Sequence, residues 1–208
     1  MATSLTLQND PISPQGYLKV NGITAATITE SGITGNLTGN VTGNLTGSLT
    51  SGGSLTFATA QTASGTAVNF TGIPNWAKRI TVIVNGLSTN GASPTQIQIG
   101  DSGGIQTTGY NLTLASIQPT TTSLQTYTSG IVFPGTEATH SRYATISMIN
   151  INSNIWIITG SGFDDITNTT GIINGIKSLT STLDRLRITT INGTNTFDAG
   201  TINIAYEG

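Results

Sequence analysis

The sequence predicts an all-β protein, in which an extended strand segment near the N-terminus precedes a jelly-roll-like β-sandwich. Three observations lead to this prediction. The composition is poor in charge and rich in β-branched residues, residues 33–50 form a four-residue repeat, and short alternating runs with turn signals follow from about residue 55. We expect little or no helix.

The composition limits the classes of function. Only 8% of the 208 residues are charged, against roughly 25% in an average domain, so hydroxyl and amide groups must supply the polar surface. Disorder is a poor match, because disordered chains combine low hydrophobicity with high charge. Seven Lys and Arg against nine Asp and Glu leave no basic surface for nucleic acid, and no nucleic-acid partner is expected.

Other absences in the sequence also exclude functions. The chain contains no cysteine, which excludes a disulfide framework and thiolate chemistry. The first residues have neither a basic region nor an apolar run typical of a signal peptide. No apolar run is long enough to span a bilayer, so we expect synthesis in the cytoplasm and no membrane insertion. No cofactor is expected either.

Residues 1–32 are predicted to form a small strand-and-turn segment. Leu5 and Leu7 alternate with polar residues, and the prolines at 11 and 14 interrupt the strand. A second alternating run ends at Asn21-Gly22, a pair that strongly favours a tight turn.

Residues 33–53, called the shaft segment below, contain the repeat [N/S]-[L/V]-T-G in ITGNLTGNVTGNLTGSLT. Glycine at every fourth position excludes collagen, which needs it at every third, and disfavours a helix. In an extended strand, Asn and Thr lie on one face and glycine alternates with large apolar residues on the other. The large apolar residues are Leu37, Val41, Leu45 and Leu49. A single strand cannot bury them, so we expect an intertwined homotrimer.

Residues 54–208 are predicted to form the β-sandwich. We expect strands near 54–59, 66–71, 79–86, 95–100, 110–115, 124–132, 143–151, 154–159, 185–191 and 201–206. The strand at 79–86 should be buried on both faces and the strand at 95–100 half exposed. Only 172–184 is a candidate for a short helical turn.

Three further strands have a clear apolar face. The faces are Ala144, Ile146 and Met148; Ile155, Ile157 and Thr159; and Ile202, Ile204 and Tyr206. Trp156 should point away from its neighbours Ile155 and Ile157.

One motif resembles a catalytic signature. Residues 100–104 spell GDSGG, the nucleophile motif of chymotrypsin-like proteases. That chemistry needs a histidine base and an aspartate that orients it, and the histidine precedes the serine in that family. The only histidine, His140, follows Ser102, so we interpret the motif as a turn between Ile99 and Ile105.

Two other polar features were considered as metal sites. Asp164-Asp165 could contribute carboxylates to calcium, but the spacing is not that of an EF-hand and no third acidic residue is close in sequence. His140 has no second histidine or cysteine nearby, and we expect it in an exposed loop. No metal site is predicted.

The aromatic residues are the candidate ligand contacts. Trp76, Tyr110, Tyr127, Tyr143 and Trp156 could stack on a sugar ring. Among them Tyr110, Tyr143 and Trp156 are the predicted ligand-binding residues, while Trp76 is interpreted as a structural plug. Loops carry recognition more often than scaffolds do, which favours the two tyrosines.

Parts of the sequence resemble known proteins. The repeat NLTGNVTGNLTG resembles the shaft segments of bacteriophage tail fibres. The stretches SGTAVNFTGIPNWAKRITVIVNGLSTNG, IQIGDSGGIQTTGY and LDRLRITTINGTNTFDAGTINIAYEG resemble a β-rich C-terminal module of tail-fibre and virion surface proteins. The resemblance implies a structural virion protein that is not an enzyme, with residues 1–32 attached to other virion proteins and residues 54–208 contacting a host polysaccharide or protein.

Alternatives remain open from the sequence. A capsid decoration protein or head fibre would share this architecture and have a structural or weakly adhesive role. A small glycan hydrolase or protease would require two close acidic residues or a His–Ser contact in a cleft.

Overall fold

The computed structural model describes residues 5–9, 16–20, 23–29, 32–34 and 55–208. All regular structure in these ranges is β-strand, as predicted. The chain divides into two units, residues 1–47 and 48–208, which we describe separately. Apart from Ile33 and Thr34, the shaft segment lies outside the described residues, including Leu37, Val41, Leu45 and Leu49. The homotrimer therefore stays a prediction.

The N-terminal unit contains a four-stranded antiparallel sheet in the order β1-β2-β3-β4. The strands are β1 (Leu5–Asn9), β2 (Gly16–Val20), β3 (Ile23–Thr29) and β4 (Gly32–Thr34). Val20 pairs with Ile23 at one end of the antiparallel ladder between β2 and β3. The expected strands are present, whereas the predicted turn at Asn21-Gly22 lies outside the described residues.

The second unit contains two antiparallel sheets, consistent with a β-sandwich. In chain order the strands are β5 (Thr56–Phe57), β6 (Gln61–Thr62), β7 (Ala67–Thr71), β8 (Arg79–Thr89), β9 (Thr95–Asp101), β10 (Gly104–Ile105), β11 (Tyr110–Ile117), β12 (Thr122–Tyr127), β13 (Ile131–Val132), β14 (Arg142–Asn152), β15 (Ile155–Asp164), β16 (Thr169–Ser178), β17 (Leu183–Thr190) and β18 (Phe197–Glu207).

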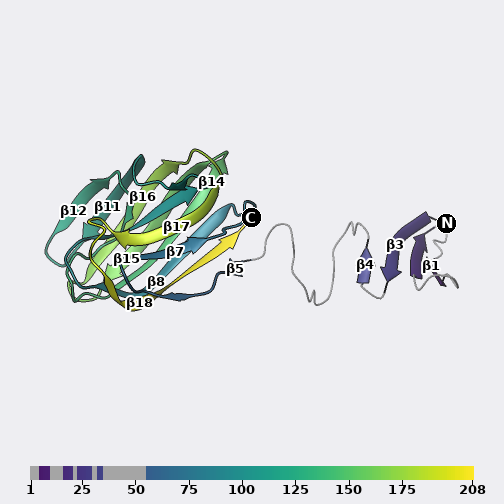
Figure 1. Ribbon diagram of the computed structural model, residues 1–208, viewed down its shortest axis with the longest axis horizontal. Coiled ribbons are helices and arrows are strands. Elements are labelled where there is room, and N and C mark those ends of the chain that lie inside the picture. Colours follow the sequence, from purple (N-terminus) through teal and green to yellow (C-terminus); the bar gives the residue numbers. More distant parts are fainter. Residues whose placement is uncertain (1–4, 10–15, 21–22, 30–31, 35–54) are drawn as a thin grey trace. The chain divides into compact units, whose positions relative to one another are not determined.

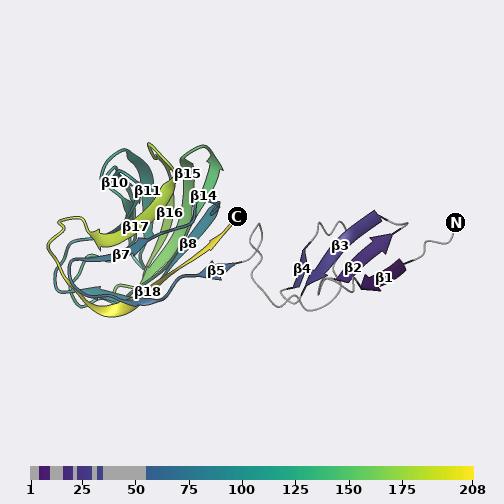
Figure 2. The same cartoon turned by 45° about the vertical axis from the view of Figure 1, so that its right-hand side comes forward.

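The larger sheet has nine strands and the smaller has five. The larger one has the order β12-β11-β16-β15-β14-β8-β18-β5, with β6 also paired to β18. The smaller one has the order β10-β9-β17-β7, with β13 paired to β9. Figure 1 and Figure 2 show β7 and β17 lying across one face of the larger sheet. We call that face the inner face and the opposite one the outer face.

The core fills the space between the sheets, because register aligns the apolar faces of neighbouring strands. Val82 of β8 pairs with Ile146 on one side and Ile204 on the other, and all three are buried. The smaller sheet contributes Ile99 and Leu186, which pair with each other and are fully buried. Burying each such side chain contributes about 1.5–3 kcal/mol.

Several predicted faces are confirmed. Ala144, Ile146 and Met148 are buried, as are Ile202 and Ile204. In β8, the face of Ile80, Val82 and Val84 is buried while Thr81 and Ile83 are half buried, so the strand is less enclosed than predicted.

Other predictions about strands were wrong. All seven residues of β9 are buried, although half exposure was expected. The side chains of Gln96 and Gln98 form hydrogen bonds with Ser129, in the loop that precedes β13. In β15 the buried face is Trp156 and Ile158 rather than Ile155 and Ile157. The run predicted as one strand at 124–132 is two strands, β12 and β13, in different sheets.

The proposed helical turn at 172–184 was also wrong. Residues 169–178 form β16, which pairs with β15 over its whole length and with β11 over residues 170–177. No described residue is helical, and in particular none belongs to a helix with the length and apolarity of a membrane span.

Candidate functional site

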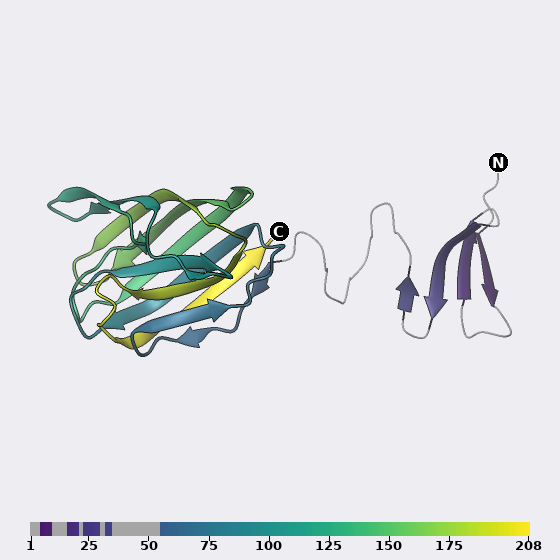
Figure 3. The same cartoon turned by 45° about the horizontal axis from the view of Figure 1, so that its top comes forward.

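A cavity of about 280 Å³ lies beside the β11–β12 hairpin, and we call it the hairpin pocket. Figure 3 shows this hairpin, in teal, at one edge of the larger sheet. The opposite wall is residues 133–140, called the site segment below, which connects β13 to β14. The volume is close to the lower end of the range of about 300–1,000 Å³ typical of small-molecule sites.

In β12 the polar side chains lie on the inner face and the apolar ones on the outer face, the reverse of the pattern in the rest of the sheet. Tyr127 and Gln125 pair with Leu112 and Leu114, whose side chains are buried in the core, so they share the inner face. Leu124 points outward and is 71% exposed. A scaffold strand would place its apolar residues inside, so this arrangement indicates a functional surface.

A pair of glycines positions the site segment. Gly162 of β15 and Gly171 of β16 are directly opposite each other. A Cβ atom would lie 2.8 Å from Pro134 Cδ at Gly162 and 2.7 Å from it at Gly171. The missing side chains therefore leave the notch in which Pro134 packs, and this is why a strand carries glycine here.

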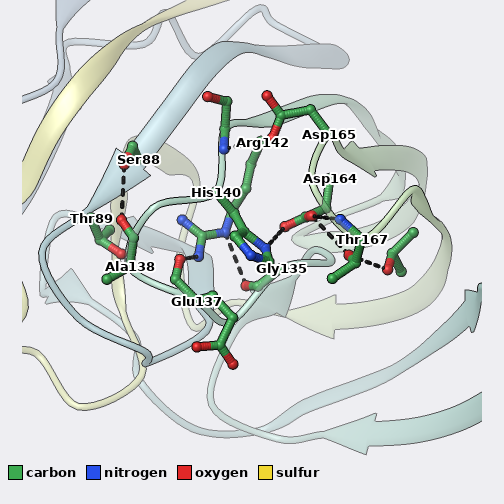
Figure 4. Close-up of polar contacts among 12 residues, drawn as sticks. Ser88, Thr89, Gly135, Glu137, Ala138, His140, Arg142, Asp164, Asp165 and Thr167 are labelled. Atoms are coloured by element: carbon green, nitrogen blue, oxygen red, sulfur yellow. Dashed lines mark hydrogen bonds and ion pairs between the residues drawn. The ribbon is translucent and has the colours of Figure 1, made fainter.

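A buried polar cluster lies behind the pocket (Figure 4). The Asp164 carboxylate accepts hydrogen bonds from the Thr167 amide (3.1 Å) and hydroxyl (2.8 Å) on Oδ1. His140 Nδ1 lies 2.8 Å from Asp164 Oδ2. An ionised carboxylate can only accept, so Nδ1 donates and Nε2 is the ring nitrogen left for other contacts. His140 lines the pocket.

Arg142 balances the buried carboxylate and holds the site segment. Arg142 of β14 lies opposite Asp164 of β15 in the strand register, and its side chain is fully buried. Its Nε donates to the Gly135 carbonyl (3.0 Å), and one terminal nitrogen donates to the Glu137 carbonyl (2.7 Å). The Ser88 hydroxyl donates to the Ala138 carbonyl, 3.2 Å away. These bonds fix the backbone of the wall (Figure 4).

Gly135 is required at its position. Its φ of +100° is disfavoured for other residues, and a Cβ there would overlap the Asp164 carboxylate and the Arg142 side chain. Any side chain would therefore push the wall away from the polar cluster.

Burial shifts the pKa values of Asp164 and Arg142 toward the neutral forms, and neighbouring groups oppose that shift. Burial alone would raise the pKa of Asp164, but the hydrogen bonds from Thr167 and His140 outweigh it and hold the pKa below its ordinary value. Burial also lowers the pKa of Arg142, and the surrounding carboxylates, Asp164 first, only partly offset that effect. Both groups remain charged near neutral pH.

The lining of the pocket suits an uncharged, hydroxyl-rich ligand. Two amides, several hydroxyls and the aromatic rings of Tyr127 and Phe133 line it, and Glu137 is its only acidic lining residue within the described part of the chain. The polar and aromatic lining residues are Ser116, Gln118, Ser123, Gln125, Tyr127, Phe133, Thr136, Glu137, His140, Thr167 and Thr169. Some are already ordered: Gln118 donates to Thr169 (3.0 Å), and Tyr127 donates to Gln125 (2.9 Å).

The three aromatic residues predicted to bind a ligand lie apart from this pocket. Tyr110 is buried, and its hydroxyl accepts from the Ile99 amide at 2.7 Å. Trp156 is also buried, while Tyr143 is 39% exposed on the outer face. Of the three, only Tyr143 is open to a partner. Trp76 is 42% exposed and packs edge-on against Tyr206, so it is not a buried plug.

The GDSGG motif forms the predicted turn, between β9 and β10. Asp101 is buried and accepts hydrogen bonds from Thr180, Ser181, Gly103 and Gln106. The Thr180 hydroxyl is the main cause of its lowered pKa. Ser102 is exposed and has no hydrogen bond to His140 in the described residues. The motif therefore acts as a turn.

The other polar features also have structural partners. His140 is buried rather than in an exposed loop, because its imidazole binds Asp164. Asp165 accepts from the Ser141 amide at 2.9 Å, so the two adjacent aspartates bind different protein groups. Within the described residues, no group of three His, Cys, Asp or Glu side chains could hold a metal.

Comparisons of the chain with known protein families, with curated proteins and with solved structures find no match.

Sequence analysis missed the hairpin pocket. Its signal was present in SLQTY at 123–127, where Ser, Gln and Tyr alternate with Leu and Thr. That alternation does not say which face is inside. Only the register with Leu112 and Leu114 places the polar side chains of β12 on the inner face of the larger sheet.

Proposed function

We propose that this chain is a structural virion protein, a bacteriophage tail fibre that attaches to the virion through residues 1–32 and contacts a host surface glycan through its C-terminal unit. The copies would join as a homotrimer through the shaft segment. The chain passes between the two sheets at several connections, which supports the jelly-roll-like sandwich expected for such a module.

The observation that carries the binding role is the inward-facing polar strand β12. Sugars are recognised by hydrogen bonds to their hydroxyl groups and by stacking of the ring on an aromatic face. The hairpin pocket combines both, with the amides of Gln118 and Gln125 beside the ring of Tyr127. Its volume fits one or two sugar units rather than a long chain.

A glycan array probed with the full-length protein tests this role, followed by titration of the best saccharide. Gln125→Ala should weaken binding by about 2- to 10-fold, since one hydrogen bond contributes about 0.5–1.5 kcal/mol. Thr126→Ala is the matched control, because this neighbour points to the outer face. Equal affinities of the two variants would exclude the hairpin pocket as the binding site.

Imaging of virions labelled at the C-terminus of this chain tests its location. Label at the tail agrees with adsorption to the host. Label across the head would replace this proposal with the capsid decoration role, and capsid stability would then be the property to measure.

A further inference from the structure

We propose that the outer face of the larger sheet, next to the β11–β12 hairpin, is an interface on which a second copy of this chain packs. The inference rests on the homotrimer proposed above and extends it from the shaft segment to the C-terminal unit. We call this surface the outer patch; its members are Ile117, Leu124, Tyr143, Phe163 and Ile172.

The register of the strands gathers these side chains. Tyr143 of β14 pairs with Phe163 of β15, and their ring centroids are 6.5 Å apart. Phe163 pairs with Thr170 of β16, which in turn pairs with Ile117 of β11. Cross-strand and diagonal neighbours on one face touch one another, so these strands form a continuous apolar surface.

The far side of the patch continues onto β12. Ile172 pairs with Ala115, and Ala115 pairs with Leu124. The exposed fractions are 46% for Ile172 and 71% for Leu124. Single exposed apolar residues are common on protein surfaces, but a contiguous group of large ones marks an interaction surface.

The chemistry of the patch favours a copy of the same chain over other partners. Its outward neighbours in register are hydroxyl-bearing, including Thr145, Ser161 and Thr170, and no charged side chain lies among them. Copies that meet around a symmetry axis bring like charges together, so an uncharged face suits them. A membrane surface would select for Lys and Arg, and a glycan would need hydrogen-bonding amides beside aromatic rings. The patch has the rings of Tyr143 and Phe163 but neither basic nor amide side chains.

The sequence supplies an independent reason for several copies. The shaft segment carries an apolar stripe that only neighbouring strands of the same kind can cover. Copies held together there have a high local concentration of their C-terminal units, which favours packing of even a modest apolar face.

Thiol labelling of the full-length protein tests this inference. The chain has no cysteine, so Thr170→Cys introduces a single thiol in the patch. Thr71→Cys is the matched control, an exposed threonine on the smaller sheet. We expect the thiol of Thr170→Cys to react with a maleimide at least tenfold more slowly, in a protein whose mass by light scattering is three times that of the chain.

A pair of charge substitutions completes the test. Phe163→Lys should restore fast labelling in the Thr170→Cys background, whereas Phe57→Lys should not, although Phe57 is 56% exposed at the opposite edge of the same sheet. Both positions are at the surface, so neither change should prevent folding.

Each other outcome overturns the inference in a recognisable way. A trimer with fast labelling at position 170 means that the shaft segment alone holds the copies. A monomer would overturn the proposed homotrimer as well. Protection that appears only in intact virions would assign the outer patch to another virion protein. Glycan binding is measured separately and does not depend on any of these results.

Discussion

Replacing Asp164 with asparagine tests whether the buried polar cluster stabilises the C-terminal unit. The carboxylate is fully buried and accepts three hydrogen bonds, two from Thr167 and one from His140. Asparagine keeps the shape and one acceptor oxygen but loses the charge. Its amide group would also face the nitrogen of His140 that now donates.

The expected loss follows from these contacts. Hydrogen bonds to a charged group contribute about 1.5–3 kcal/mol and neutral ones about 0.5–1.5 kcal/mol, so weakening two and losing one costs about 3.5–6 kcal/mol. Relief from burying a charge returns about 1 kcal/mol. We expect Asp164→Asn to lower the free energy of unfolding by about 2.5–5 kcal/mol, or Tm by about 5–20 °C for a unit of this size.

The pH dependence gives a second readout. The pKa of Asp164 is lowered in the folded protein, so its contribution is fully present above the ordinary value of 3.8 and is lost as the pH falls through the folded value. The stability difference between wild type and Asp164→Asn should therefore be constant from about pH 5 to 7 and shrink below about pH 4.

Urea unfolding of the full-length protein between pH 3 and 7 measures both quantities. Asp165→Asn is the control, because Asp165 is half exposed and accepts one amide hydrogen bond. It should cost less than about 1 kcal/mol. A loss below about 0.5 kcal/mol for Asp164→Asn, or one that persists unchanged at pH 3, would refute the reasoning.

Three more predictions concern the site segment, the shaft segment and residues 1–30. Gly135→Ala should destabilise the C-terminal unit by about 1–3 kcal/mol in the same assay, because the new methyl group needs a strained φ and displaces Asp164 and Arg142; an unchanged midpoint would contradict this. Val41→Asp should give a monomer by light scattering, whereas Thr42→Asp, on the other face of the repeat, should remain a trimer, and an intact Val41→Asp trimer would refute the shaft prediction. Deleting residues 1–30 should leave a folded protein that no longer joins the particle, and finding the shortened chain in purified virions would refute the attachment role.

The alternation of apolar and polar residues correctly predicted strands whose pattern depends only on nearby residues. The strands that contribute Ile146 and Ile204 each show a clean two-residue period, and each buries the expected face, whereas the strand of Val82 buries one face rather than the two that were predicted. That period depends only on the strand itself and on one buried side. The turn in GDSGG was equally predictable, since its chemistry is contained in a few neighbouring residues.

The sequence did not reveal β16, because its glycines are explained by contacts with residues far away in the chain. Gly171 and Gly175 weaken strand propensity locally. At Gly171, however, the missing side chain makes room for Pro134, which is 37 positions earlier in the chain. His140 was misplaced for a similar reason, since its buried partner Asp164 lies on another strand.

The position of β18 has a consequence for how the protein is made. This final strand, Phe197–Glu207, lies between β8 on one side and the short strands β5 and β6 on the other. Until it has left the ribosome, the larger sheet remains split, with the buried edge of β8 open to solvent. Pairing partners so far apart in sequence form slowly, and an open apolar edge invites contact with other chains. The larger sheet can therefore close only after β18 has been synthesised, and chains interrupted before residue 197 would keep the edge of β8 open.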